Sequence, residues 1–124
     1  MNKIIPLIFT VLLSGCSTYS SNIRVGNSMD YVSLETQRKA LTTIEEQDAI
    51  PTGAIAIGTV DAARCHRSFM EKTPTNQITL NDLKVAAYSQ GADGITNVVI
   101  DAQSGITKNC WMIVDGQADM YKYK

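Results

Sequence analysis

The start of the chain most constrains what can fold, because it sets both the compartment and the length left for a domain. A single cation, Lys3, precedes an apolar run from Ile4 to Leu13. This order of charge and apolar residues is typical of an export signal. The run is too short to cross a bilayer as a helix, which takes roughly 20 apolar residues. We therefore expect the rest of the chain to fold in an oxidising compartment outside the cytoplasm.

The apolar run leads into Leu13-Ser14-Gly15-Cys16, a sequence that resembles the bacterial lipobox. In that motif small residues let the peptidase approach, and the cysteine thiol receives a diacylglyceryl group before cleavage leaves it as the new N-terminus. Residues 1–15 are thus predicted to be a removed signal peptide, and Cys16 a lipidated first residue. Ser17 in place of an aspartate favours the outer membrane, with the domain facing the periplasm.

The remaining chain is long enough for one small domain but not for two. Its 11 lysines and arginines nearly balance the 12 aspartates and glutamates, with no run of like charge. This gives no indication of a nucleic-acid surface or a polybasic membrane segment, so the lipid is expected to be the only membrane contact. We divide the mature chain into a lipidated N-terminus with a flexible tether at 16–38 and a folded domain at 39–124.

The chain has three cysteines. With Cys16 assigned to the lipid, Cys65 and Cys110 remain as a pair in an oxidising compartment, and we expect them to form a disulfide. Closing a loop of this length would stabilise the fold by about 4 kcal/mol on the chain-entropy account. The alternative is two buried free thiols.

The first element of the domain is ambiguous. Leu34, Leu41 and Ile44 would share one stripe of a helix, whereas the sequence from Ala40 to Ile44 also suits a strand. We favour the strand. Pro51 and Gly53 then break any helix and turn the chain towards the next element.

Residues 53–60 are apolar at both odd and even positions, as in a strand covered on both faces. We expect them to form the central strand of the sheet. After it, residues 61–65 are expected to leave the sheet, and the polar segment at 67–76 is expected to be a loop.

The clearest helix is predicted to begin at Thr79, which could cap it together with Asp82, a weaker form of the capping box. Gly91 is placed to end this helix. Asp93-Gly94 then turns the chain into a second buried strand at 95–101, which is rich in β-branched residues.

Residues 111–123 fit two interpretations. Asp115-Gly116 is a strong hairpin signal, yet the apolar alternation continues through it. In one long strand, Gly116 would be a bulge or a point of close contact. In a hairpin, Trp111 would oppose Met120, and periodicity alone leaves both interpretations open.

No catalytic, metal or cofactor site is predicted. His66 follows Cys65, but a cysteine in a disulfide is no thiolate, and chain neighbours rarely have the geometry of a base and its nucleophile. The aspartates are expected to be solvated at turns and strand ends, and no His or Cys cluster has metal-ligand spacing. The aspartates concerned are Asp61, Asp101, Asp115 and Asp119.

Five residues are candidates for binding a partner. Aromatic residues of the last strand could form a recognition surface or could simply pack in the core. Two arginines, expected in a loop beside Cys65, could steer association. The candidates are Arg64, Arg67, Trp111, Tyr121 and Tyr123.

At this point the chain resembles the RcsF family of stress-sensor lipoproteins. The resemblance runs from about Ala40 to Tyr123. It begins with an aliphatic strand, followed by Pro51-x-Gly53-Ala54-x-x-Ile57-Gly58-x-Val60 and Cys65. A capped helix with Ala86-Ala87, the pattern Gly94-x-x-x-Val98 and Cys110 at the last strand complete it. Cys65 and Cys110 match one of the family's two disulfides. The second disulfide and the family's Pro-rich, basic tether have no counterpart in this chain.

The resemblance implies an α+β fold: a small mixed sheet of about four strands with one packed helix, cross-linked by a disulfide. It also favours a continuous last strand. For function it implies an outer-membrane lipoprotein that acts through contacts with envelope proteins in stress sensing. The alternatives are a structural or maintenance lipoprotein and, more distantly, a small periplasmic enzyme.

Overall fold

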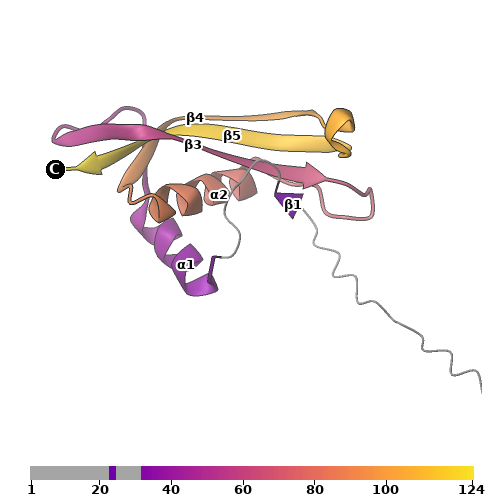
Figure 1. The fold of residues 1–124 in the computed structure, drawn as a ribbon, viewed down its shortest axis with the longest axis horizontal. Helices are drawn as coiled ribbons and strands as arrows, with labels where there is room; N and C mark the ends of the chain where they lie inside the picture. Colours follow the sequence, from indigo (N-terminus) through magenta and orange to yellow (C-terminus); the bar gives the residue numbers. More distant parts are fainter. Residues whose placement is uncertain (1–22, 25–31) are drawn as a thin grey trace, which may run out of the picture.

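The computed structural model describes residues 23–24 and 32–124. The elements in chain order are β1 (Ile23–Arg24), α1 (Leu34–Thr43), β2 (Glu45–Gln47), β3 (Ala54–His66), α2 (Asn76–Ser89), β4 (Gly94–Ser104), a 3₁₀ turn η1 (Ile106–Lys108) and β5 (Met112–Tyr123). Figure 1 shows the long strands as one layer, with α2 beneath them and α1 packed on α2. The predicted α+β class, mixed sheet and Cys65–Cys110 disulfide are confirmed, and a second helix is added.

β5 is the central strand of the sheet, whose order is β1-β3-β5-β4-β2. It pairs antiparallel with β3 on one side and β4 on the other, while β2 pairs parallel with β4. Asp115-Gly116 lies within this strand and makes no turn, which confirms the interpretation as one long strand. The residues buried on one face alternate as expected: Val114, Gly116, Ala118 and Met120.

Gly116 lies in close contact with α2. A Cβ atom at this position would lie 3.0 Å from both Leu83 Cδ1 and Thr79 Cγ2. Leu83 and Thr79 are fully buried, and the main core extends from this contact between α2 and the sheet. The lack of a side chain at Gly116 therefore lets the helix pack directly onto the central strand.

The segment predicted as a first strand is the helix α1 instead. Ser33 caps it, since its hydroxyl accepts a hydrogen bond from the Thr36 amide at 3.2 Å, and Glu35 and Lys39 form an i,i+4 ion pair at 3.0 Å. Ala40 and Ile44 are buried. These local helix signals outweigh the strand propensity of the threonines at its end, so residues 34–38 belong to a helix and not to a tether.

The prediction that residues 53–60 form a central strand covered on both faces is wrong. β3 lies beside the central strand, and Ile55 and Ile57 are 45% and 37% exposed. The prediction that residues 61–65 leave the sheet is also wrong, because β3 continues to His66 with each residue paired to β5. Pairing with a long partner strand keeps this polar segment in the sheet despite its weak apolar pattern.

The α2 helix begins at Asn76, one turn before the predicted start. Thr75 is the capping residue, and its Oγ1 accepts a hydrogen bond from the Ile78 amide at 3.3 Å. Thr79 faces the sheet instead of capping. The helix ends at Ser89, and Gly91 follows with a φ of +80°, which fits its predicted role as a stop. The next strand, β4, is longer than predicted, and Val99 within it is exposed.

Gly116→Val should destabilise the fold, because the added side chain must displace Leu83 or Thr79. Overpacking of this kind costs about 1–3 kcal/mol in the free energy of unfolding. The neighbouring Gln117 is exposed, so Gln117→Val should change that free energy by no more than about 0.5 kcal/mol. Urea unfolding of both variants measures the difference, and equal effects would show that α2 does not pack on Gly116.

Candidate functional site

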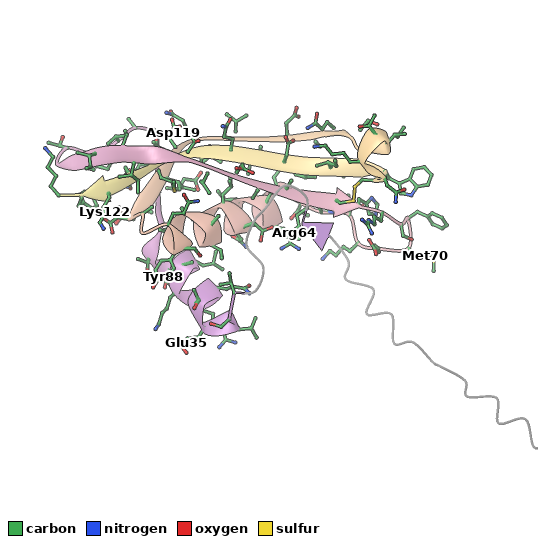
Figure 2. The ribbon with its side chains drawn as sticks, in the orientation of Figure 1. Glu35, Arg64, Met70, Tyr88, Asp119 and Lys122 are labelled. Atoms are coloured by element: carbon green, nitrogen blue, oxygen red, sulfur yellow. A yellow bond between two sulfur atoms is a disulfide. The ribbon has the colours of Figure 1, made fainter. Side chains whose placement is uncertain are left out.

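The structure separates the five residues predicted to bind a partner. Arg67 and Trp111 lie at the end of the sheet where β3 finishes and β5 starts, and Tyr121 and Tyr123 lie near the other end of β5. In Figure 2 the first end carries the label of Met70 and the second that of Lys122. The five residues therefore do not form one surface.

Arg64 belongs to β3 and not to the expected loop. Its Nε and Nη2 donate to the two carboxylate oxygens of Asp82 in α2, with 2.9 Å between Nη2 and Oδ1. The two side chains are only 18% and 5% exposed. This bidentate ion pair joins the sheet to the helix, so a charge reversal at Arg64 should destabilise the fold.

Arg64→Gln should destabilise the domain, because it leaves the buried Asp82 carboxylate without its bidentate partner. Breaking such a pair from one side costs about 3 kcal/mol. Arg67→Gln removes an exposed charge three residues away and should leave the free energy of unfolding nearly unchanged. Thermal unfolding of both variants tests this contrast, and an Arg64 variant as stable as the Arg67 variant would contradict it.

Tyr121 is a core residue and not part of a recognition surface. Its ring lies over Gly94, where a Cβ atom would approach Tyr121 Cζ within 2.2 Å, and its side chain is fully buried. Burial raises the pKa of Tyr121 to about 12, with Tyr123 and Glu45 nearby adding to the shift. Tyr123 packs edge-on against it at 5.9 Å between ring centroids but is itself exposed.

The other end of the sheet carries exposed apolar side chains on two loops. Phe69 and Met70 are 82% and 85% exposed, and Ile106 and Trp111 are 77% and 65% exposed. Arg67 and Trp111 also line a shallow hollow of about 270 Å³. We call Arg67, Phe69, Met70, Ile106 and Trp111 the tip surface.

The disulfide holds the loops of the tip surface in place. Cys65 in β3 and Cys110 before β5 are joined with 5.6 Å between their Cα atoms. Beside the bond, the Trp111 amide donates to the His66 carbonyl at 2.7 Å. His66 Nε2 lies 3.2 Å from the Glu71 carbonyl oxygen, a hydrogen bond that ties the loop after β3 to the strand. The histidine and cysteines thus serve as cross-links of the tip in this structure.

Removing the disulfide should loosen the tip surface and lower stability. Cys65→Ala, Cys110→Ala and the double variant should each cost roughly 2–5 kcal/mol in the free energy of unfolding. The double variant should be no less stable than either single variant, since one bond is lost in all three. Non-reducing mass spectrometry checks the link, and free alkylation of both thiols in the native protein would contradict it.

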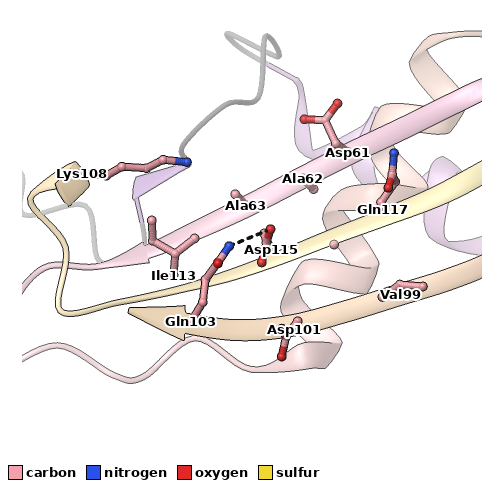
Figure 3. Close-up of a pocket in the computed structure, with 11 residues that line it drawn as sticks. Asp61, Ala62, Ala63, Val99, Asp101, Gln103, Lys108, Ile113, Asp115 and Gln117 are labelled. Carbon is pink, nitrogen blue, oxygen red and sulfur yellow. Dashed lines mark hydrogen bonds between the residues drawn. The ribbon is translucent and has the colours of Figure 1, made fainter. Parts of the chain in front are cut away.

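A second surface lies on the face of the sheet opposite α2. A groove of about 390 Å³ runs across β3, β5 and β4, and we call it the sheet groove (Figure 3). Its polar lining comes from side chains at alternate positions of these strands and from η1: Asp61, Asp101, Gln103, Lys108, Asp115 and Gln117. Val99, Ala63 and Ile113 supply apolar contacts.

Asp115 lies at the centre of the sheet groove. It is directly opposite Asp101 on β4 and Ala63 on β3. Gln103 Nε2 donates to Asp115 Oδ2 at 3.1 Å, the contact drawn as a dashed line in Figure 3. Asp115 Oδ1 is buried and has no hydrogen-bond partner among the described residues. The groove therefore holds a carboxylate that the protein itself satisfies only in part.

The expectation that the aspartates lie at turns and strand ends is wrong, because all four lie within β3, β4 or β5. Strand register gathers Asp61, Asp101 and Asp115 in the sheet groove, whereas Asp119 lies outside its lining and accepts a hydrogen bond from Asn97 at 2.8 Å. The alternation of Asp115, Gln117 and Asp119 was a signal for a polar strand face. No set of three His, Cys, Asp or Glu side chains among residues 23–24 and 32–124 is arranged to hold a metal ion.

Comparison with known proteins adds no relative: no family model matches this chain, and no curated protein matches it. None of the helices in the described part of the chain is long and apolar enough to cross a membrane. The signal peptide and Cys16 lie outside the described residues. Lipidation, the outer-membrane location and the resemblance to the RcsF family therefore stay predictions from the sequence.

Proposed function

We propose that this chain is a lipid-anchored protein of the bacterial outer membrane that acts by binding another envelope protein, in stress sensing like the family it resembles. The export signal, the lipobox-like Leu13-Ser14-Gly15-Cys16 and the family resemblance support the location and the role. The observation that supports binding is the sheet groove, which presents polar side chains from three paired strands on an open face.

Two features of the sheet groove should lower the free energy of unfolding of the domain. Asp101 and Asp115 face each other on neighbouring strands, and like charges at directly opposite positions destabilise a sheet. The buried Asp115 Oδ1 without a partner adds a desolvation cost. Lys108 is the single cation in the lining, set against three carboxylates. Local conflict of this kind is typical of a functional surface.

A cationic side chain from a partner would relieve the first of these costs. A lysine or arginine placed between Asp101 and Asp115 would pair with two carboxylates. Val99 and Ala63 would contact the aliphatic part of such a side chain. Small-molecule sites are mostly apolar and enclosed, whereas this groove is open and charged, so a basic segment of a polypeptide fits it better.

Asp101→Asn should make the domain more stable but weaken its binding to a partner. Removing one of two opposed charges should raise the free energy of unfolding by about 0.2–1 kcal/mol. The same change should weaken in-cell crosslinking to the partner and lower envelope-stress signalling, since a charge that pairs with the partner is lost. Glu46→Gln, an exposed change in β2 outside the groove, is the matched control. Unchanged crosslinking and signalling in the Asp101 variant would remove the groove as the binding surface.

The sensing role is tested by a stress reporter in three strains. They carry the wild-type protein, a deletion, and a form released to the periplasm by an ordinary signal peptide. A sensor restricted by its anchor should give three different responses, because anchoring limits which partners it can meet. Identical responses would leave a structural lipoprotein as the better description.

A further inference from the structure

We propose that the tip surface rests on the bilayer in which Cys16 is anchored, so that the domain touches the membrane through its own side chains as well as through the lipid. This proposal uses the lipidation of Cys16 from the proposed function. It goes beyond the expectation that the lipid is the only membrane contact. Three observations support it: where β1 lies, how short the preceding chain is, and what the tip exposes.

β1 joins the sheet at the tip. Ile23 pairs with Cys65, one residue from His66, whose carbonyl accepts the Trp111 amide. Because β1 and β3 are antiparallel, the chain enters β1 from the side of the tip and then runs away from it. Figure 1 shows β1 beside the end of β3, far from the C-terminal end of β5.

The chain between the lipid and β1 is short. Six residues, 17–22, separate Cys16 from Ile23. Even fully extended, the seven steps from Cys16 to Ile23 span roughly 25 Å. The glyceride on Cys16 lies at the level of the headgroups, so the tip can lie no more than about this distance from the membrane surface.

The chemistry of the tip surface fits an interface between water and lipid. Phe69, Met70, Ile106 and Trp111 expose large apolar side chains, and tryptophan is enriched at the level of the headgroups in membrane proteins. Arg67 and Lys72 are exposed beside them, against the half-buried Glu71. Apolar side chains next to cations bind a surface of anionic lipids.

The bilayer fits this surface better than a protein does. A partner on the tip would have to enter the narrow space between the domain and the membrane. The anchor also holds the tip at a high effective concentration near the bilayer, so weak apolar contacts are enough for binding. The carboxylates of the sheet groove lie on β3, β4 and β5, and only Lys108 of its lining belongs to a tip loop, so anionic lipids would repel the acidic part of the groove.

Trp111 reports directly on the contact, because it is the only tryptophan of the chain. The probe is full-length lipidated protein in vesicles of phosphatidylethanolamine and phosphatidylglycerol. We expect blue-shifted emission, protection from acrylamide and quenching by brominated acyl chains. Emission and acrylamide quenching equal to those of the lipid-free mature chain in buffer would overturn the proposal.

A matched pair of variants tests the side chains in the lipid-free mature chain. Phe69→Ser with Met70→Ser should lower partitioning into the same vesicles by about tenfold or more, as expected for two apolar side chains. Ile55→Ser with Ile57→Ser removes exposed apolar side chains near the opposite end of β3 and should leave partitioning unchanged. Equal partitioning of both double variants would contradict the tip as the contact. Near-ultraviolet circular dichroism confirms that each variant is folded.

The outcomes separate this proposal from the proposed function. If mass spectrometry finds no lipid on Cys16 but the mature chain still partitions through Phe69 and Met70, the anchor is wrong and the tip contact stands. If Cys16 is lipidated but acrylamide still quenches Trp111 in vesicles that contain no other protein, the tip contact is wrong and the anchor stands. The proposal of a membrane contact would also be overturned if the tip crosslinked to an envelope protein in cells and acrylamide still quenched Trp111 in vesicles that contain no other protein.

Discussion

The Cys65–Cys110 bond is the constraint on which the end of the molecule with the tip surface depends. The buried residues of the tip, Cys65, Cys110 and Ile113, form a cluster separate from the main core under α2. So small an apolar cluster would not hold two loops in place by burial alone. The bond fixes the end of β3 against the start of β5, and β1 pairs at the same point. One covalent link thus sets the shape of the tip and the place where the N-terminal segment joins the domain.

The packing around α2 is locally consistent, and two departures from such consistency lie at the two proposed surfaces. Others lie elsewhere, such as the buried hydroxyls of Thr96 and Tyr121, which have no hydrogen-bond partner among the described residues. Around α2, capping, helix packing on Gly116 and the buried Arg64–Asp82 pair favour the same arrangement. The sheet groove instead opposes two carboxylates, and the tip surface exposes large apolar side chains to water. Each of these two surfaces has a physical cost in the isolated domain. A basic partner and a lipid surface, respectively, would remove these costs.

The sequence predicted features that follow from local rules or from the number of cysteines. Three cysteines with one assigned to lipid predicted the disulfide. The alternation through Gly116 left one strand and a hairpin both open, and the family resemblance favoured one strand. It did not predict β3 beyond Val60, since only pairing with β5 keeps those polar residues in the sheet. The sheet groove was missed for the same reason: Asp101 and Asp115 are neighbours through register, which a single sequence does not reveal. Trp111 and Arg67 were identified, but Phe69, Met70 and Ile106 were not, because exposure of apolar loop residues depends on tertiary packing.

The central claim is an orientation: the tip surface faces the bilayer and the sheet groove faces away from it. Hydrogen–deuterium exchange, measured on the lipidated protein in vesicles and on the lipid-free mature chain in buffer, tests it most directly. The account predicts slower amide exchange in vesicles for the tip loops at 67–75 and 105–111, and unchanged exchange for the groove strands at 99–103 and 115–117. Protection of the groove strands instead, or no difference at the tip loops, would contradict this orientation.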